Sequence, residues 1–318
     1  MPQERSPRAT LEGLTVVIAA RNEEHSLPRC LDSILRQSPP PAGLEVIVVA
    51  NNCSDRTADA ARAMAGEAAA IGVDLVVIEV FEGGKHLALN CGDSAANNPA
   101  RAYVDADVLL SGGTIAAARE ALLEFHLVAP RLQVLRPSTS LGRSYAAVWE
   151  RSPAVKSRVI GCGFYAVSGS GRSRWDTFPD IISDDTYVRL HFERGEQAVL
   201  QGESVLLSLP AKARELLLVR GRWCRGNRQV HRLFPDLVDR ERRGLWRSTY
   251  GMLLRTPSLW RHVPGAGLVF VCGKLLALAY SGVGAERWET ATSSSIRSAP
   301  GPAIPVQGGL PSRLAARR

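Results

Sequence analysis

The stretch Tyr103-Val104-Asp105-Ala106-Asp107-Val108 decides how the rest of the chain is interpreted. Apolar and aromatic residues lead up to two carboxylates, and two leucines follow them. The pattern predicts a buried strand whose end presents Asp105 and Asp107 on one side, because residues two apart in an extended chain point the same way. Two carboxylates so placed repel each other unless a cation neutralises them. Mg²⁺ or Mn²⁺ prefers such oxygen ligands and can also bind phosphates, whereas the plainer interpretation is an Asp-rich turn.

Alternating apolar strands and amphipathic helices precede this stretch. Strands are expected at 14–20, 44–50 and 75–81, and helices at 27–35, after Thr57 and at 86–96. This alternation indicates an α/β protein with a mostly parallel central sheet and helices on both faces. Ligands bind beyond the carboxyl ends of the strands in such sheets. The polar residues that follow the strands should therefore gather at one edge: Asn22, Asn52, Asp55, Lys85, Asp105 and Asp107.

The second half of the chain has a weaker pattern. A helix is expected after Gly113, an irregular stretch at 132–137 and a strand within 159–168. The further expected elements are a helix at 144–149, a loop at 169–172, a helix from Ser183, a strand region at 197–209 and a basic helix from Lys212.

Charge is distributed unevenly along the 318 residues, which carry a formal net charge of +8. From Lys212 to His262 there are 13 Lys and Arg residues against four Asp and Glu residues. This segment suggests anionic partners, such as diphosphates, acidic lipid head groups or nucleic acid, although a solvated arginine-rich helical surface has the same composition. The six cysteines are scattered without a Cys-x-x-Cys, which disfavours a zinc site or a disulfide framework and indicates a reducing cytosol.

The C-terminal part contains one apolar segment, 263–285, in which Lys274 is the sole charge. Its length could cross a bilayer, but its five glycines and its lysine favour a half-buried or in-plane anchor. The expected organisation is a flexible N-terminus (1–13), a catalytic domain (14–232), a basic, helical, membrane-proximal segment (233–288) and a disordered tail (289–318).

The order of the short motifs resembles that of the inverting glycosyltransferases of family 2, which have the GT-A fold. The resemblance covers roughly Leu14 to Arg232. The matching motifs are Ala-Arg-Asn-Glu at 20–23, Asn-Asn-Cys-Ser-Asp-Arg-Thr at 51–57, Gly-Lys-His-Leu-Ala-Leu-Asn at 84–90, Asp-Ala-Asp at 105–107, Ser-Asp-Asp at 183–185 and Arg-Trp at 222–223.

The resemblance implies roles on the side of the sugar donor. It places Arg21, Glu23, Asn52 and Asp55 near the base and ribose of a nucleotide, where carboxylates and amides can accept hydrogen bonds. Loop polarity and helix capping would also account for such residues. Lys85 is implied to face the base or a phosphate.

The resemblance also implies the groups that carry the chemistry. Asp105 and Asp107 correspond to the metal-binding pair, which with Mg²⁺ or Mn²⁺ stabilises the leaving diphosphate. Asp184 and Asp185 correspond to an acidic pair at the sugar donor, with Asp185 the general base for the acceptor hydroxyl. Capping of a helix would equally suit Ser183 and Asp184. On the basic helix, Arg222 or Arg225 would close over the diphosphate, and Trp223 would offer a flat apolar face to a sugar acceptor.

The function expected from these motifs is the transfer of a hexose from a nucleotide-diphosphate donor to an acceptor hydroxyl with inversion. Val219 stands where membrane-bound polysaccharide synthases have Gln in a Gln-x-x-Arg-Trp motif, so single-sugar, non-processive transfer is expected. The acceptor could be lipid-linked, in polysaccharide or glycolipid biosynthesis, and the protein would be cytoplasmic and peripheral or monotopic at the inner face of the cell membrane, with no nucleic-acid partner.

Two alternatives belong to other functional classes. One is a nucleotidyltransferase that makes an activated sugar, which Arg21-Asn22-Glu23 disfavours because a glycine-rich basic loop is expected there. The other is a non-enzymatic binder of an anionic membrane or nucleic acid, which would leave the four aspartates without a purpose.

Overall fold

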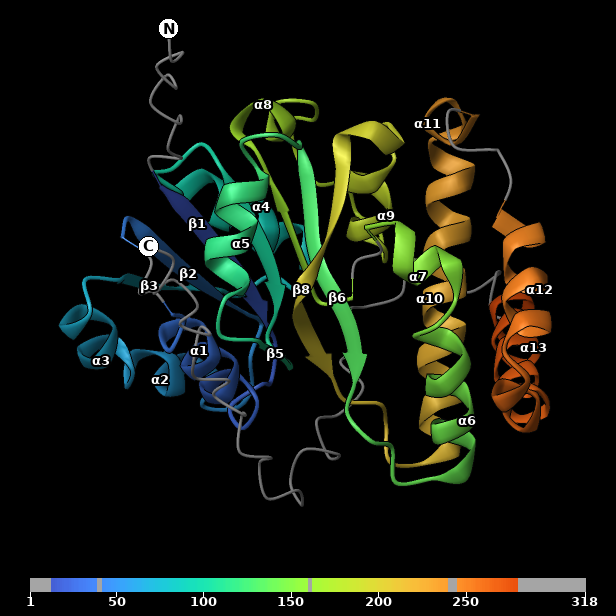
Figure 1. The fold of residues 1–318 in the computed structure, drawn as a ribbon. Helices are drawn as coiled ribbons and strands as arrows, with labels where there is room; N and C mark the ends of the chain where they lie inside the picture. Colours follow the sequence, from blue (N-terminus) through green and yellow to red (C-terminus); the bar gives the residue numbers. More distant parts are fainter. Residues whose placement is uncertain (1–12, 39–41, 160–161, 240–244, 280–318) are drawn as a thin grey trace, which may run out of the picture.

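The structure is a computed structural model that describes residues 13–38, 42–159, 162–239 and 245–279 (Figure 1). The expected flexible N-terminus, apart from Gly13, and the expected disordered tail at 289–318 lie outside these ranges.

The first half of the chain forms four parallel strands of one sheet, as expected. β1 is paired with β2 on one side and β4 on the other, and β3 lies beyond β2. The bounds are β1 (Leu14–Ala20), β2 (Leu44–Asn51), β3 (Asp74–Val80) and β4 (Arg101–Asp105). The register aligns Ala19 of β1 with Asp105 of β4, so the polar residues that follow β1 and β4 emerge at the same edge.

The other four strands complete an eight-stranded sheet in the order β3-β2-β1-β4-β7-β6-β8-β5. β7 runs antiparallel to both β4 and β6, while β6 and β8 are parallel. The bounds are β5 (Val108–Leu110), β6 (Leu127–Val134), β7 (Phe164–Val167) and β8 (Gln197–Leu207).

Strand β6 was missed by the sequence analysis, which expected an irregular stretch at 132–137. The register with β8 shifts between Pro130 and Arg131. A proline cannot donate a ladder hydrogen bond, and the inward–outward alternation begins only after it. The expected loop at 169–172 is also wrong, because these residues form the short helix α8 (Gly169–Arg172).

Helices cover both faces of the sheet, and the alternation of side chains along β1 explains why. Val16 and Ile18 pack in one core cluster, Val17 and Ala19 in the other, because successive strand residues point to opposite faces. The first cluster includes residues of α1 (Leu27–Leu35), α2 (Thr57–Arg62), α3 (Ala65–Ala70), α5 (Thr114–Ala121) and α6 (Ser140–Trp149). The second includes α4 (Lys85–Ala95) and α9 (Asp184–Arg189).

The C-terminal helices stand together beside the sheet (Figure 1). The long helix α10 packs against α13, and α13 also packs against α6. Small residues allow this close approach, since a Cβ on Gly273 would meet the Arg220 side chain and one on Gly265 would meet Ser144. The remaining bounds are α7 (Pro153–Ser157), η1 (Arg194–Glu196), α10 (Ala213–Leu233), α11 (Pro235–Asp239), α12 (Leu245–Arg255), η2 (Pro257–His262) and α13 (Val263–Ala279).

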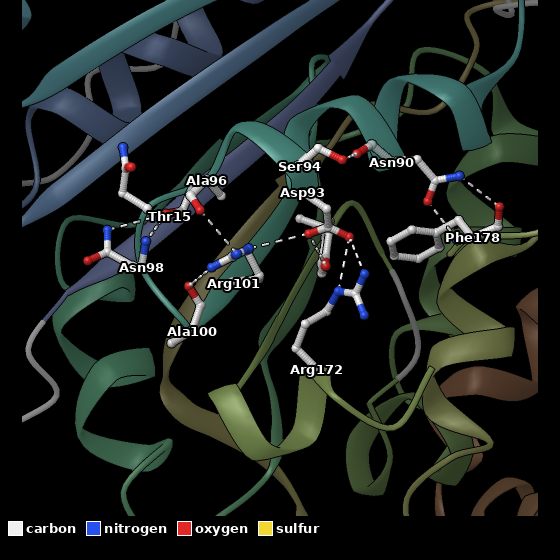
Figure 2. Close-up of polar contacts among 12 residues, drawn as sticks. Thr15, Asn90, Asp93, Ser94, Ala96, Asn98, Ala100, Arg101, Arg172 and Phe178 are labelled. Atoms are coloured by element: carbon white, nitrogen blue, oxygen red, sulfur yellow. Dashed lines mark hydrogen bonds and ion pairs between the residues drawn. The ribbon is translucent and has the colours of Figure 1, made fainter. Parts of the chain in front are cut away.

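A buried ion network ties α4, β4 and α8 together (Figure 2). The Asp93 side chain is 8% exposed and lies 3.3 Å from Arg101 Nε and 2.9 Å from Arg172 Nη2. Its Oδ1 also accepts a hydrogen bond of 2.8 Å from the Tyr103 hydroxyl. One carboxylate therefore compensates two guanidinium groups behind the strand that ends in Asp105.

Replacing Asp93 by alanine should destabilise the fold strongly. The change leaves Arg101 and Arg172 without their buried carboxylate, and breaking such an arrangement costs about 3–5 kcal/mol. Denaturant unfolding would measure the loss. The control is Asp59→Ala, which removes a surface partner of Arg62 that is 71% exposed and should cost less than about 1 kcal/mol. Equal losses for the two variants would contradict this account.

Candidate active site

The site is built on the carboxyl end of β4. Asp105 is the last residue of that strand, and its backbone N–H donates to the Gly163 carbonyl over 2.9 Å. Gly163 has φ +87°, and a Cβ there would overlap the Val108 side chain. Only glycine meets both requirements, so Gly163 lets the segment before β7 reach the Asp105 backbone. Asp107 follows two residues later and is exposed to solvent.

Lys85 connects the two acidic pairs, which are far apart in the sequence. Its Nζ lies 2.9 Å from Asp105 Oδ1 and 2.9 Å from Asp184 Oδ1. Burial lowers the pKa of Lys85, but the two carboxylates outweigh this effect and raise it above its ordinary value. The ammonium group is therefore a permanent cation between the expected metal pair and the expected base pair. That Lys85 faces the base or a phosphate of the donor stays a prediction.

The turn before Lys85 is fixed by a buried asparagine at the end of β2. Asn51 Oδ1 accepts from the Gly84 N–H over 2.9 Å, and its Nδ2 donates to the Glu82 carbonyl over 2.8 Å. These two bonds set the point at which α4 begins and thus where the Lys85 side chain starts.

Asp184 and Asp185 differ in what remains available to a substrate. Asp184 is 5% exposed; besides contacting Lys85, it accepts a hydrogen bond of 2.9 Å at Oδ2 from the Tyr165 hydroxyl. Both of its oxygens are therefore engaged within the protein. Asp185 is half-buried. Ser183 precedes α9 but makes no side-chain capping hydrogen bond.

Electrostatics separate the four aspartates. Burial raises the pKa of Asp185 to about 7, with the Asp184 charge adding to the effect. Although the Asp107 side chain reaches solvent, the surrounding protein desolvates its carboxyl and raises its pKa to about 6, and the Asp105 charge is the next cause. For Asp105 the raising effect of burial is outweighed by Lys85, so its pKa lies below its ordinary value. Among the aspartates, Asp185 is thus poised to exchange a proton near neutral pH, and Asp105 and Asp107 form a repelling pair suited to a cation.

The loops after β1 and β2 each contain an asparagine with left-handed backbone, and the first of them joins the two loops. Asn22 has φ +55° and Asn52 has φ +48°, a conformation that asparagine tolerates better than most residues. Asn22 Oδ1 accepts from the Ser54 N–H over 2.8 Å, and the Asn52 N–H donates to the Val80 carbonyl over 2.6 Å.

Two of the residues expected to bind the nucleotide also hold these loops together. The Asp55 carboxylate accepts from the Glu24 N–H over 3.2 Å and from the Thr57 N–H over 3.0 Å. Glu23 is 7% exposed, and burial raises its pKa to about 7 despite its bond to Ser26. The charges of Asp107 and Asp105 raise that pKa further. Arg21 is half-buried at the start of the same loop.

Helix α10 brings basic residues to the acidic pair. The Arg222 charge lowers the pKa of both Asp105 and Asp107, so the guanidinium group lies near both carboxylates. Arg225 is half-buried one turn further along. The ring of Trp223 lies 5.3 Å from the ring of Trp149 of α6. The side chain that was expected to meet a sugar acceptor therefore has an aromatic neighbour.

Contacts between α9 and α10 fix this arrangement. Thr186 Oγ1 donates to Asn227 Oδ1 over 2.8 Å, and the Ile182 N–H donates to Gln229 Oε1 over 3.0 Å. Gly226 is needed at the crossing, because a Cβ there would overlap Ser183. The helix that carries Arg222 is therefore held against the helix that carries Asp185.

The sequence analysis missed Tyr165, Asn51 and Gly163 as contributors to the site. Tyr165 pairs with Tyr103 across β4 and β7, and its contact with Asp184 depends on that pairing, which no local motif signals. Asn51 directly follows an apolar run and opens the motif at 51–57, and these are the sequence signals that could have identified it.

The comparisons with known proteins agree with this architecture. Residues 15–151 match the model of glycosyl transferase family 2. The match assigns these residues, somewhat less than half of the chain, to a glycosyltransferase domain of that family. No curated protein matches the sequence of the chain.

The solved structures that are similar to the chain include a mannosyltransferase and TarS. A mannosyltransferase from Pyrobaculum calidifontis, in complex with GDP-Man and Mn²⁺, shares 19% identity over 85% of this chain and 75% of that chain, with a TM-score of 0.55. TarS from S. aureus, residues 1–349 with UDP-GlcNAc, shares 12% identity over 84% of this chain and 91% of that chain, with a TM-score of 0.49. The first similarity shows that the fold is of the GT-A type.

The donor atoms at the end of β4 fit a hard divalent cation that is completed by a substrate. Among the described residues, no group of three or more His, Cys, Asp or Glu side chains could hold a metal alone. Asp105 and Asp107 offer carboxylate oxygens, the ligand type that Mg²⁺ and Mn²⁺ prefer, and Mg²⁺ is usually bound by one or two carboxylates plus substrate phosphates and water. The mutual repulsion that raises the pKa of Asp107 would be relieved by such a cation.

Proposed function

We propose that this glycosyltransferase transfers a hexose from a nucleoside-diphosphate sugar to an acceptor hydroxyl, with inversion at the anomeric carbon. The observation that carries the proposal is the double contact of Lys85. Its ammonium group touches Asp105 and Asp184 at 2.9 Å each, which brings the pair suited to a cation and the pair suited to proton transfer into one site of a family 2 domain.

The donor side contains the groups that stabilise a departing diphosphate. Asp105 and Asp107 would hold Mg²⁺ or Mn²⁺, which when bound neutralises charge on the diphosphate. Arg222, which lies near both carboxylates, adds a donor suited to bidentate phosphate contact. Arg225 would do the same from the next turn. Preorganised positive charge of this kind stabilises the transition state because it need not reorganise during the reaction.

The acceptor side depends on Asp185. The acceptor oxygen attacks the anomeric carbon from the side opposite the diphosphate, and the bond from that carbon to the diphosphate oxygen breaks. The proton of the acceptor hydroxyl passes to the Asp185 carboxylate, and a pKa of about 7 suits a base that must accept it near neutral pH. Asp184, held by Lys85 and Tyr165, would fix the donor end of the site.

The nucleotide would bind at the loops after β1 and β2. Arg21, Glu23, Asn52 and Asp55 all lie on these loops, and the bonds between the loops keep them in register. Exposed Asn52 could accept and donate hydrogen bonds to a base or ribose. The mannosyltransferase of the same fold binds a nucleotide sugar together with Mn²⁺, which supports this arrangement.

The transfer would be non-processive, and the enzyme would work at the inner face of the cell membrane. Val219 replaces the Gln of the synthase motif, and within the described residues one stretch, Pro257–Ala279, is long and apolar enough to cross a membrane. A lipid-linked acceptor would be consistent with this location. Polysaccharide or glycolipid biosynthesis would be consistent with the location and with such an acceptor.

Thermal unfolding in the presence of nucleotides tests the proposal. UDP, GDP, ADP and CDP would each be added with and without Mn²⁺, and one of them should raise the Tm only with the metal, because a ligand that binds the folded state stabilises it. A triphosphate that stabilises more than any diphosphate would favour the nucleotidyltransferase alternative. If no nucleotide changes the Tm under either condition, the proposed donor class is wrong.

A further inference from the structure

Helix α13 carries an apolar stripe that faces away from the protein. Leu268, Val271, Leu275 and Leu278 are each between 53% and 58% exposed. Their spacing of three, four and three residues places them on one face of a helix. We call these four residues the outer stripe. Trp260, just before α13, is 57% exposed and extends the apolar surface.

The opposite face of α13 is already occupied by the protein. Ala266, Val269, Gly273 and Ala277 are the buried residues of α13, and the helix packs against α10 and α6. Phe270 receives the Arg220 guanidinium over its ring at 5.0 Å and lies 5.3 Å from the Tyr145 ring. The helix is therefore held along its inner side, whereas the four side chains of the outer stripe are each more than half exposed.

The basic residues near the outer stripe indicate which kind of partner it binds. Residues 245–279 contain Arg247, Arg255, Arg261 and Lys274 but no Asp or Glu. Lys274 is exposed on α13 between Val271 and Leu275, and Arg261 is exposed beside Trp260. An apolar helix face with basic residues around it is the combination that binds the interface of an anionic bilayer.

We infer that the outer stripe and Trp260 lie in the plane of an anionic membrane surface, with α13 parallel to the bilayer and still packed on α10 and α6. A spanning orientation is disfavoured by the packing of α13, which contacts both α10 and α6. It would also bring Lys274 into hydrocarbon and detach the inner face from α10. In the plane, the lysine reaches the head groups while its stem covers apolar surface.

Vesicle binding by the full-length protein tests the inference. The probe is phosphatidylcholine vesicles with or without phosphatidylglycerol, separated by sedimentation. The wild type should bind the anionic vesicles, and binding should weaken with added salt because screening reduces the attraction. The variant L268Q/L275Q removes two outer-stripe side chains without changing charge and should bind at least about ten-fold more weakly.

The matched control is I71Q/L123Q, which replaces two apolar residues that are each 43% exposed and lie outside the C-terminal helices. This variant should bind vesicles as the wild type does. Equal binding by the two double variants would overturn the inference. So would a loss of self-association in L268Q/L275Q without vesicle binding by the wild type, which would assign the stripe to a second copy of the chain.

Orientation and fold need separate measurements. A C-terminal tag should remain accessible to an antibody added outside the vesicles, and protection of the tag would show that α13 spans the bilayer. L268Q/L275Q should unfold at the wild-type Tm; if it does not, Lys274→Glu serves as a second variant, which should weaken binding to anionic vesicles. If Lys274→Glu binds anionic vesicles as the wild type does, the inference that basic residues select an anionic membrane is wrong. The inference does not depend on sugar transfer, because D185N should bind vesicles normally.

Discussion

Replacing Asp185 by asparagine should reduce sugar transfer by about 10²–10⁴-fold, the usual contribution of a general base. The amide has nearly the same shape as the carboxylate but cannot take the proton of the acceptor hydroxyl. Nucleoside diphosphate binding should survive, because the donor-side groups are unchanged. Release of nucleoside diphosphate from UDP- and GDP-sugars measures the first quantity, and the nucleotide-dependent rise in Tm measures the second.

The pH profile supplies an independent check on Asp185. A base works when deprotonated, and burial and the Asp184 charge raise the pKa of this carboxyl to about 7. The rate should therefore increase as pH rises from 6 to 8, and this limb should disappear in D185N. Asp176→Asn changes an exposed aspartate in the segment before α9 and should leave rate and profile unaltered. Near-normal turnover of D185N would exclude the assignment.

The parts of the site that could be predicted from the sequence are those encoded locally. Asp105 and Asp107 follow an apolar strand within one short stretch, and the paired strand–helix pattern placed them at the same edge as Asn52 and Lys85. The register of β1 with β4 confirms that edge. Local patterning is sufficient here because the strands are buried on both faces and read as continuous apolar runs.

The parts that could not be predicted depend on contacts between distant segments. The position of Lys85 between Asp105 and Asp184 requires β7 to run antiparallel to β4 and α9 to return to the sheet, and nothing around Lys85 signals either event. The same holds for Tyr165, whose hydroxyl reaches Asp184 only because β7 lies next to β4. β6 was missed because a proline and a register shift interrupt its alternation.

Replacing Asp107 by asparagine should have opposite effects on the unliganded and the liganded protein. Without ligand, Asp107 is a carboxylate beside Asp105, and desolvation by the surrounding protein together with that neighbour raises its pKa to about 6. Removing the charge removes the repulsion, so the unliganded variant should be as stable as the wild type or more stable at pH 7.5. The sign follows from the raised pKa, because a group whose pKa is higher in the folded state costs stability once pH exceeds that pKa.

With nucleoside diphosphate and Mn²⁺ the same substitution should remove most of the metal-dependent stabilisation. The substitution removes one of the two carboxylates expected to bind the cation. A bound molecule present at about 100 times its Kd contributes about 2.7 kcal/mol of folding free energy, and most of this contribution should be lost. Denaturant unfolding with and without Mn²⁺ gives both quantities in one experiment. Asp59→Asn, on the exposed face of α2, should change neither. If D107N is destabilised without ligand but keeps its response to Mn²⁺, Asp107 is a structural residue of the turn before β5, and the cation must be sought elsewhere.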